Sequence, residues 1–434
     1  MRILFSLLTV LPLVASMTVP AADIALTHVN LVDVEKLQIR PEQTVLIKDG
    51  LIVAIVPADK PIPSGYAAVD LSGKYLLPGL IDAHVHHATV PEGSDNPDIT
   101  RQRLQRLLHG GVTTVRDMGG DVRVLSGLKR SAQLDLIPAP DIYYSVILGG
   151  RLFFNDPRTV ASALGEKPGD TDWMRAVDNN TDFAALMQRT VGTGASGIKI
   201  YASVPSVIVG KLAEAAKEAG LKVWSHAFIG PDTPQTVVDA GVEVISHVPD
   251  LSAQVIDNYV AWRRRNATIS ETEQQASFQP ERYSQLLQSM QQQGTILDAT
   301  LTVFEKYRHT GTNREVMFQH GVFLTRLAHQ HGIRISAGTD SVDDNSVLPL
   351  LHHELQLLVK QGGLTPAEAV QAATLNSALA IGIADSTGSV SVGKKANLLV
   401  LNDDPFADIR NSRSIAYVLK NGRFIDRGDD LPTP

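Results

Sequence analysis

The segment from Asp82 to His86 carries two histidines, His84 and His86, with one valine between them. It ends an apolar run that predicts a buried β-strand. Because side chains two positions apart on a strand point to the same side, the two imidazoles can bind one metal ion. In isolation, the same spacing also fits a capped pair or a pair on the protein surface.

Four further residues with suitable side chains stand at the ends of other apolar runs. A lysine within a buried strand is costly unless it is paired or neutralised. Each of the four has a structural alternative: a lysine that reaches solvent, a hydrogen-bonded core histidine, or an aspartate that caps a turn. Because all four occupy the same relative place as the histidine pair, one shared site is favoured. They are Lys199, His226, His247 and Asp340.

These candidates belong to a pattern of eight short apolar runs that alternate with longer amphipathic stretches. The alternation predicts βα units with a buried parallel sheet, and eight units predict an α/β fold with a closed (β/α)8 TIM barrel. Because the carboxyl ends of barrel strands converge on one mouth, the six candidates are expected to meet there. The expected strands are 76–85, 112–116, 142–147, 198–201, 222–226, 242–247, 295–299 and 333–338.

Amphipathic stretches between and after these runs predict helices. The last of them begins with Thr365 as N-cap and Pro366 at the first helical position. The expected helices are 207–219, 283–293, 348–360 and 366–380.

Two segments interrupt the alternation. Residues 149–176 carry aromatic side chains among glycines and prolines, and residues 262–279 are polar and charged. Loops at this end of a barrel usually shape access to the site, so we interpret 149–176 as a lid. An ordinary surface insertion with a few anchoring aromatic residues is the alternative.

Short alternating runs at both ends of the chain predict a second, smaller domain. We expect a small β-sandwich built from residues 22–75 and 386–434, with the barrel formed by residues 76–385. The strand pairs are 44–47 with 51–54, joined by a turn at Lys48-Asp49-Gly50, and 397–401 with 415–419, followed by a turn at Asn421-Gly422.

Composition narrows the classes of function. The net charge is −7 with both signs interspersed, and no basic stripe suits a phosphate backbone, so nucleic acid is not an expected partner. The chain has no cysteine. Disulfides and thiolate ligands are therefore excluded, and any metal must be held by histidine, a carboxylate or a modified lysine.

The first 21 residues begin with Met1-Arg2, continue with an apolar run and end in small residues. The run is too short to span a bilayer, so it predicts a signal peptide cleaved after Ser16 or Ala21. We therefore expect an exported, periplasmic or secreted protein without stable membrane insertion after cleavage. A buried core segment is the alternative.

Three segments carry a resemblance to a known family: 79–86, 110–117 and 388–398. With them the chain resembles the amidohydrolase superfamily, in the branch that includes imidazolonepropionase-like and metal-dependent dipeptidase-like sequences. The resemblance extends over nearly the whole mature chain. It implies a binuclear metal centre and the same barrel that the apolar runs predict.

The resemblance also implies a role for each candidate. Carbon dioxide carbamylates Lys199, which then bridges two divalent metal ions, and the carbamate relieves the cost of burying a cation. Asp340 acts as general base and then as general acid for the leaving nitrogen. Zinc is the expected metal, with manganese or cobalt as alternatives. The ligands are His84, His86 and Asp340 for one metal, and His226 and His247 for the other, with Lys199 between them.

Residues beside the ligands are candidates for substrate contacts or for support of the ligands. Phe228 stands where related dipeptidases often carry a polar residue or tyrosine, which weighs against recognition of a peptide carboxylate. In the tail, Asn397 replaces the family's usual aspartate, with an expected effect on the small domain alone. The candidates for substrate contacts are Arg116, Tyr201, Phe228 and His353, with His87 as a further supporting candidate; His309, His320, His329 and His331 are expected to be exposed.

We therefore expect a hydrolase that cleaves an amide bond in a small molecule such as a dipeptide or an N-acyl amino acid. A lactone, cyclic amide or carbamate is the alternative substrate, and a homo-oligomer remains open. A mononuclear deaminase is disfavoured because it has no bridging lysine on the fourth strand. The non-enzymatic alternative is an exported binding protein that has lost turnover.

Overall fold

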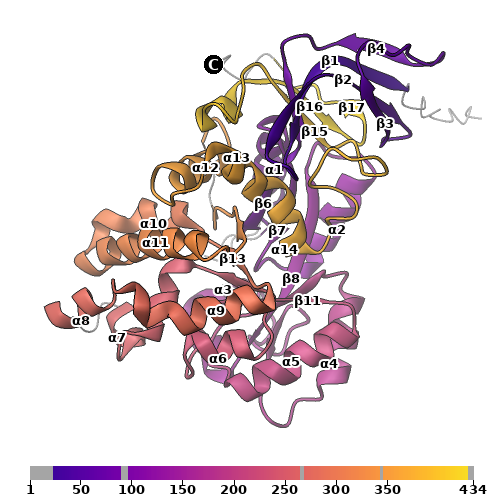
Figure 1. Cartoon of the computed structure of the whole chain (residues 1–434). Coiled ribbons are helices and arrows are strands. Elements are labelled where there is room, and N and C mark those ends of the chain that lie inside the picture. Colours follow the sequence, from indigo (N-terminus) through magenta and orange to yellow (C-terminus); the bar gives the residue numbers. More distant parts are fainter. Residues whose placement is uncertain (1–22, 89–95, 264–267, 343–345, 429–434) are drawn as a thin grey trace, which may run out of the picture.

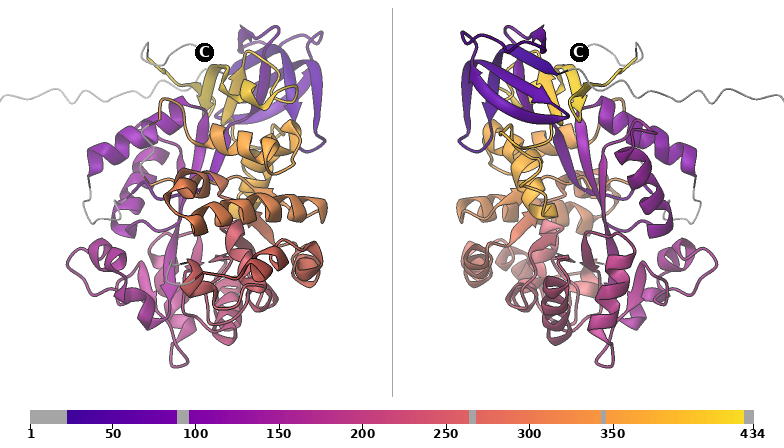
Figure 2. Two further views of the ribbon diagram at one scale, coloured as in Figure 1. Left: turned by 90° about the vertical axis from the view of Figure 1, so that its left-hand side faces the viewer. Right: turned by 90° about the vertical axis from the view of Figure 1, so that its right-hand side faces the viewer.

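The computed structural model describes residues 23–88, 96–263, 268–342 and 346–428. It contains two sheets, one central and parallel, the other built from both ends of the chain. Figure 2 shows the N-terminal strands in indigo and the C-terminal strands in yellow side by side at one end of the molecule. The predicted signal peptide, residues 1–21, lies outside the described residues.

Eight parallel strands surrounded by helices form the nearly closed TIM barrel, which confirms the expected fold class (Figure 1). A short additional strand, β9 (Met174–Ala176), pairs with β8. The barrel strands are β6 (Leu80–Val85), β7 (Val112–Asp117), β8 (Asp141–Gly149), β10 (Gly197–Ile200), β11 (Lys222–His226), β12 (Val244–Ser246), β13 (Ile296–Asp298) and β14 (Ile335–Ser336).

Backbone hydrogen bonds join the last barrel strand to the first. The amide of Asp340 donates to the carbonyl of His84 at 2.8 Å, and the amide of His86 donates to that of Ser341 at 2.8 Å. The segment after β14 is therefore fixed against the strand that carries the histidine pair. Closure of the barrel and assembly of the candidate site depend on the same contacts.

The first expected strand, 76–85, is two strands in different sheets. β5 (Tyr75–Pro78) pairs with β15 (Leu398–Leu401) in the sheet of the chain ends, whereas β6 belongs to the barrel. Gly79 separates them, and a β-carbon there would overlap the side chain of Thr113. A glycine inside an apolar strand pattern often marks such a close approach.

The helices confirm most of the expected boundaries within a few residues. The last expected helix is interrupted by a π-helical turn, Ala372–Asn376, and its predicted cap is present: the Thr365 hydroxyl accepts from the amide of Glu368. No helix in the described ranges is long and apolar enough to cross a membrane. The helices are α1 (Pro97–His109), α2 (Val122–Gln133), α3 (Pro157–Ser162), α4 (Phe183–Gly192), α5 (Ser206–Glu218), α6 (Pro234–Asp239), α7 (Tyr259–Arg263), α8 (Glu271–Ala276), α9 (Ser284–Gln293), α10 (Leu301–Tyr307), α11 (Thr312–Gln330), α12 (Leu351–Lys360), α13 (Pro366–Gln371) and α14 (Ser377–Ile381).

The strands of the two chain ends form one connected sheet around a core of its own. In β15, Leu398 and Val400 belong to this core, whereas Leu399 and Leu401 face the core of the barrel. The predicted hairpin of residues 44–47 with 51–54 is confirmed. Besides β5 and β15, the strands are β1 (Ile24–Asp33), β2 (Gln38–Lys48), β3 (Leu51–Pro57), β4 (Ala67–Asp70), β16 (Ile415–Lys420) and β17 (Arg423–Phe424).

Asn397 links this sheet to the barrel, so its effect is not confined to the small domain as expected. Its amide nitrogen donates to Asp141 of β8 at 3.2 Å, and its amide oxygen accepts from the backbone of Asn421 at 2.8 Å. Lys395 and Lys420 also lie within ion-pair distance of Asp141. An aspartate at position 397 would place a second carboxylate against Asp141, which the asparagine avoids.

The two inserted segments are anchored by aromatic side chains. In 149–176, Phe154 and Trp173 are buried, and the guanidinium of Arg123 lies 4.3 Å from the centre of the Trp173 ring. In 262–279, of which residues 264–267 lie outside the described residues, Phe278 stacks on His320 of α11 with ring centres 4.3 Å apart. The anchoring aromatics of the surface-insertion alternative are therefore present, and the lid stays a prediction.

His320 is fully buried, so the expectation of an exposed side chain was wrong. Its Nε2 lies 2.7 Å from the hydroxyl of Ser277, which itself donates to the carbonyl of Gln274. Nε2 must therefore be the donor, and Nδ1 is a buried nitrogen without a proton or a hydrogen-bond partner. Burial lowers the pKa of His320 to about 3. The polar neighbours of His320 in the helix suggested an exposed side chain. Its burial comes from Ser277 and Phe278, which lie elsewhere in the sequence.

We predict that His320→Gln makes the stability of the protein less sensitive to acid. Because the pKa of His320 is lower in the folded state than in the unfolded state, its contribution is complete above pH 6.5 and is lost as the pH falls towards 3. Between pH 6 and pH 4 the parent should lose about 1 kcal/mol more unfolding free energy per pH unit than the variant. Urea unfolding in the presence of a chelator measures the unfolding free energy of both proteins at each pH.

His309→Gln, on the exposed surface, is the control and should follow the parent. Equal slopes for the parent and His320→Gln would show that the buried imidazole is protonated without cost.

Candidate functional site

The six predicted ligands gather at the carboxyl end of the barrel strands. His84 and Lys199 lie within β6 and β10, and His226 ends β11. The other three follow strands directly or closely: His86 after β6, His247 after β12 and Asp340 after β14. All six side chains therefore come from the positions that the strand pattern predicted.

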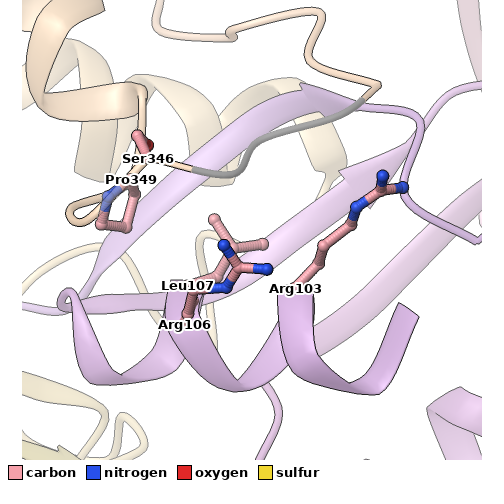
Figure 3. A pocket seen from close by; sticks show the side chains of 5 residues that line it. All are labelled: Arg103, Arg106, Leu107, Ser346 and Pro349. Atoms are coloured by element: carbon pink, nitrogen blue, oxygen red, sulfur yellow. The ribbon is translucent and has the colours of Figure 1, made fainter. Parts of the chain in front are cut away.

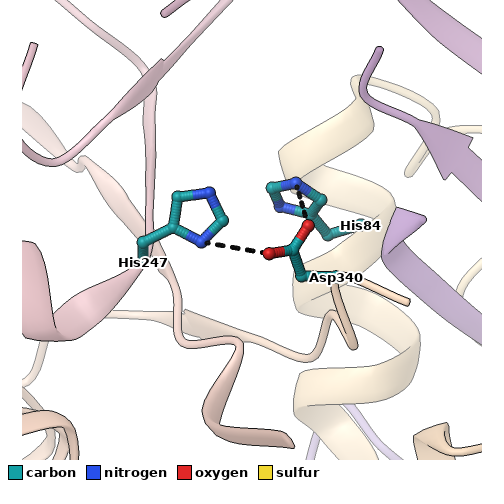
Figure 4. A group of neighbouring side chains, drawn as sticks. All are labelled: His84, His247 and Asp340. Carbon is teal, nitrogen blue, oxygen red and sulfur yellow. Dashed lines mark ion pairs between the residues drawn. The ribbon is translucent and has the colours of Figure 1, made fainter. Parts of the chain in front are cut away.

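The carboxylate of Asp340 lies at the centre of the group. Its Oδ1 is 3.4 Å from Nε2 of His84 and 3.1 Å from Nε2 of His86, and its Oδ2 is 3.8 Å from Nδ1 of His247. Figure 4 shows the imidazoles of His84 and His247 approaching different oxygens of this carboxylate. Ligand atoms of His84, His247 and Asp340 all lie within 4.8 Å of one another.

His226 extends the group through a ring contact with His247. Its ring centre is 4.7 Å from that of His247 and 4.4 Å from that of Tyr201. The Tyr201 ring in turn stacks on Phe153 of the 149–176 segment, with centres 5.2 Å apart. The aromatic part of the inserted segment therefore lies directly beside the predicted ligands.

Lys199 is fully buried, and its ammonium nitrogen donates to the hydroxyl of Ser246 at 2.9 Å. That hydroxyl donates to Oδ2 of Asp298 at 3.0 Å, and the same oxygen accepts from Nδ1 of His84 at 2.8 Å. The side chain of Lys199 is thus connected to a predicted ligand through two hydrogen-bonded groups.

Sequence reasoning missed Asp298 and Ser246. Asp298 ends β13, and the expected strand 295–299 already contained it. A carboxylate at the end of a predicted barrel strand was the signal that could have identified it, as for the other candidates. Ser246 ends β12, where nothing in the sequence distinguishes it from an ordinary buried serine.

Burial sets the protonation states of the histidines. It lowers the pKa of His84 to about 4 and that of His247 to about 3, and it lowers the pKa of His226 well below its usual value. The three imidazoles are therefore neutral near pH 7, which is the form that binds a metal ion.

Burial also affects the pKa values of Asp340 and Lys199. Burial raises the pKa of Asp340, but the charges that His84 and His247 carry when protonated, together with the hydrogen bond to His86, outweigh it and hold that pKa below its usual range. Burial lowers the pKa of Lys199 to about 7, so part of this amine is uncharged at neutral pH. An uncharged amine is the form that reacts with carbon dioxide.

The residues present fit divalent metal ions. Nε2 of His84 is buried and has no hydrogen-bond partner, although it faces Oδ1 of Asp340. A buried nitrogen of this kind needs a partner, which a metal ion would supply. Imidazole nitrogens together with a carboxylate suit zinc and similar cations.

Two of the ligands have left-handed backbone conformations, with φ of 72° at His247 and 52° at Asp340. Such conformations are unfavourable for residues other than glycine and cluster at functional sites. Backbone hydrogen bonds hold both: the amide of His247 donates to the carbonyl of Asp298 at 3.1 Å, and that of Asp340 to His84.

The candidates for substrate contacts have different surroundings. Tyr201 lies beside His226, whereas Phe228 packs edge-on against Tyr259 with ring centres 5.2 Å apart. Nε2 of His353 contacts the carboxylate of Glu305 rather than one of the predicted ligands. Its neighbour His352 is buried and contacts the carbonyl of Gly110.

Arg116 is fully buried and lies beneath the cluster. Its Nη2 donates to Asp298 at 3.1 Å, its Nε donates to the carbonyl of Ala83, and its guanidinium lies 4.8 Å from the centre of the Trp224 ring. This placement favours the supporting role over a contact with substrate. His87 also has a supporting position, with Nε2 3.2 Å from the hydroxyl of Ser341.

A separate pocket lies against α1 and contains none of the predicted ligands. Figure 3 shows Arg103, Arg106 and Leu107 on α1, with Ser346 and Pro349 on a neighbouring part of the chain. The pocket is lined by Arg103, Arg106, Leu107, Ser346 and Pro349.

Comparison with known proteins gives one family and several relatives. The model of the amidohydrolase family matches residues 75–425. Ochratoxinase from Aspergillus niger is 30% identical over 149 residues, which cover 31% of this chain and 30% of that protein. Imidazolonepropionase from Deinococcus radiodurans is 40% identical over 88 residues, which cover 20% of each protein. These alignments thus span less than a third of the curated relatives' own lengths.

Among solved structures, the crystal structure of a prolidase candidate from Bifidobacterium longum is similar over most of the chain. It is 25% identical, with a TM-score of 0.69 and coverage of 93% of this chain and 95% of that one. The similarity includes both the barrel and the sheet of the chain ends, because it extends over nearly all the described residues.

We predict that Gly338→Ala disrupts the cluster. A β-carbon at Gly338 would lie 2.6 Å from that of His84 and would overlap Oδ1 of Asp298. The substitution should therefore lower the free energy of unfolding by about 1 to 3 kcal/mol and reduce the amount of bound metal. Urea unfolding and elemental analysis of the purified protein measure the two effects.

Gly127→Ala is the matched control, because a β-carbon at Gly127 of α2 would meet open space. Its stability should be equal or higher by about 0.5 to 1 kcal/mol, with the parent's metal content. Parent-like stability and metal content in Gly338→Ala would mean that His84 and Asp298 shift freely.

Proposed function

The chain belongs to the amidohydrolase family, and from this premise we propose that it is a metal-dependent hydrolase that cleaves an amide C–N bond in a small substrate. The observation that carries the proposal is the position of Asp340 among His84, His86 and His247 at the mouth of the barrel. This arrangement combines the neutral imidazoles of His84 and His247 with an ionised carboxylate that is partly exposed.

The proposed centre is binuclear. His84, His86 and Asp340 would hold one divalent metal ion, and His226 and His247 the other. Lys199, carbamylated by carbon dioxide, would lie between them. Zinc is the expected metal, with manganese or cobalt as alternatives. When bound, such ions polarise the carbonyl group of the substrate and favour deprotonation of a water molecule.

Asp340 supplies the proton transfers of the proposed reaction. Because its pKa is held below the usual range, it is ionised and can accept a proton from water. The water oxygen then bonds to the carbonyl carbon, the C–N bond breaks, and Asp340 returns the proton to the leaving nitrogen. The products are a carboxylic acid and an amine, so atoms and charge balance without a further reactant.

The expected substrate is a dipeptide or an N-acyl amino acid. The similar proteins support hydrolysis of an amide bond, since they include a prolidase candidate and an ochratoxinase. Phe153 and Tyr201 place two stacked aromatic rings beside His226, which suits an apolar group next to the scissile bond. A lactone or cyclic amide is the alternative substrate, and export is proposed from the N-terminal segment alone.

We predict that the purified protein carries nearly two metal ions per chain and that Lys199→Ala abolishes its activity. Without the lysine, no bridging group remains for the pair of ions. Elemental analysis, combined with a hydrolysis screen of dipeptides, N-acyl amino acids and lactones, measures both properties. Asp340→Asn should reduce turnover by at least about 100-fold, because the amide cannot transfer the proton.

The control is Lys222→Ala, which removes a partly exposed lysine from the opposite end of the neighbouring strand. It should keep both the metal content and the activity of the parent. One metal ion with unchanged turnover in Lys199→Ala would refute the bridging role. A parent that binds metal but hydrolyses no compound would instead support an exported binding protein.

A further inference from the structure

Three donors converge on one oxygen of Asp298, a residue that touches no substrate in the reaction above. Oδ2 accepts from Nδ1 of His84 at 2.8 Å, from Nη2 of Arg116 at 3.1 Å and from the hydroxyl of Ser246 at 3.0 Å. Both Asp298 and Arg116 are fully buried. Hydrogen bonds to a buried charged group are stronger than those between neutral groups, so this oxygen is a fixed point in the barrel.

The carboxylate determines which nitrogen of His84 faces Asp340. An ionised carboxylate only accepts hydrogen bonds, so Nδ1 of His84 must carry the proton of the neutral ring. Nε2 is then left with a lone pair, and it is the atom that lies 3.4 Å from Asp340. With the proton on Nε2 instead, the ring would present N–H where a ligand is needed.

The same oxygen also sets the place of Lys199. The Ser246 hydroxyl has one proton, which it donates to Asp298, so its oxygen is directed to accept from the nitrogen of Lys199. His84 on β6 and Lys199 on β10 are therefore both positioned by the same oxygen of Asp298 on β13.

Asp298 is itself held from below the site. Arg116 binds it with Nη2, while its other nitrogens donate to the carbonyls of Ala83 and Ala380. Trp224 lies against the guanidinium and donates through Nε1 to the same carbonyl of Ala380 at 2.8 Å. These contacts fix the carboxylate independently of any metal ion.

We propose that Asp298 is a positioning residue that fixes the ring orientation and tautomer of His84 directly and the nitrogen of Lys199 through Ser246. The inference rests on the proposed metal-dependent function and assigns a role to residues outside the predicted ligand set. Carboxylates that bind the second nitrogen of a metal-binding histidine orient the ring and strengthen metal binding.

The experiment compares Asp298→Asn and Ser246→Ala with the parent by zinc titration against a chromophoric chelator. Asp298→Asn removes the charge that serves both ligands, so the affinity at both metal sites should fall about 10- to 100-fold. Ser246→Ala removes only the connection to Lys199, so the affinity for the second zinc ion should fall while that for the first changes by less than about threefold.

Asp141→Asn is the matched control. Asp141 is another buried barrel aspartate paired with cations, but it begins β8 at the opposite end of the strands. Its substitution should reduce stability and leave both zinc affinities at the parent values. A general loss of packing would instead weaken zinc binding in all three variants, which would overturn the positioning role.

A second measurement uses the metal-free protein. In ¹⁵N-histidine spectra, assigned by comparison with His84→Gln, the parent should show His84 protonated at Nδ1, and Asp298→Asn should show protonation shifted towards Nε2. Parent-like zinc affinities together with an unchanged tautomer in Asp298→Asn would overturn the proposal. If that variant does not fold, an Nε2 proton on His84 in the parent, or unaltered second-site affinity in Ser246→Ala, would do so.

These outcomes separate the inference from the proposed function. A parent that binds no zinc contradicts the metal-dependent function, and the tautomer of His84 in the metal-free protein still tests the contact with Asp298. A parent that binds two zinc ions, while Asp298→Asn binds them equally well and keeps the parent's His84 tautomer, contradicts the positioning role alone.

Discussion

The exclusion of water from ionisable groups at the mouth of the barrel constrains this structure most strongly. A buried charge without partners costs far more than a single hydrogen bond contributes, so each such group must be paired where the fold places it. Arg116, Asp298 and Lys199 satisfy this requirement through one connected set of hydrogen bonds. Together with Ser246 and His84, these residues come from five different strands, and the barrel must therefore close in one register for the set to form.

Closure of the barrel also assembles the candidate site. Backbone hydrogen bonds between the segment after β14 and the segment of β6 place Asp340 beside the histidine pair. A shift of one residue between these segments would turn Asp340 away from His84, because alternate side chains of a strand face opposite sides. The left-handed backbone at Asp340 and His247 shows that the surrounding contacts are strong enough to hold unfavourable conformations at the site.

Much of the architecture and most of the site could be predicted from the sequence, because both follow from local patterns. Apolar runs located all eight barrel strands, and polar residues at their ends located the ligand positions. The run 76–85 was taken as one strand because its apolar pattern is continuous across Gly79, where the chain passes from one sheet to the other. His320 was misjudged because its burial depends on Ser277 and Phe278, which are distant in sequence. Asp298 was missed because a buried aspartate gains its role only from partners on other strands.

The pairing of β5 with β15 affects how the chain folds during synthesis. β5 lies between β1 and β15 in the sheet, yet β15 follows it by some 320 residues in the sequence. Until the ribosome has released the C-terminal segment, one edge of β5 lacks its neighbour, and contacts of such long range form late. Unpaired strand edges promote association with other chains, so the nascent protein depends on residues that are made much later to cover a segment that emerges early.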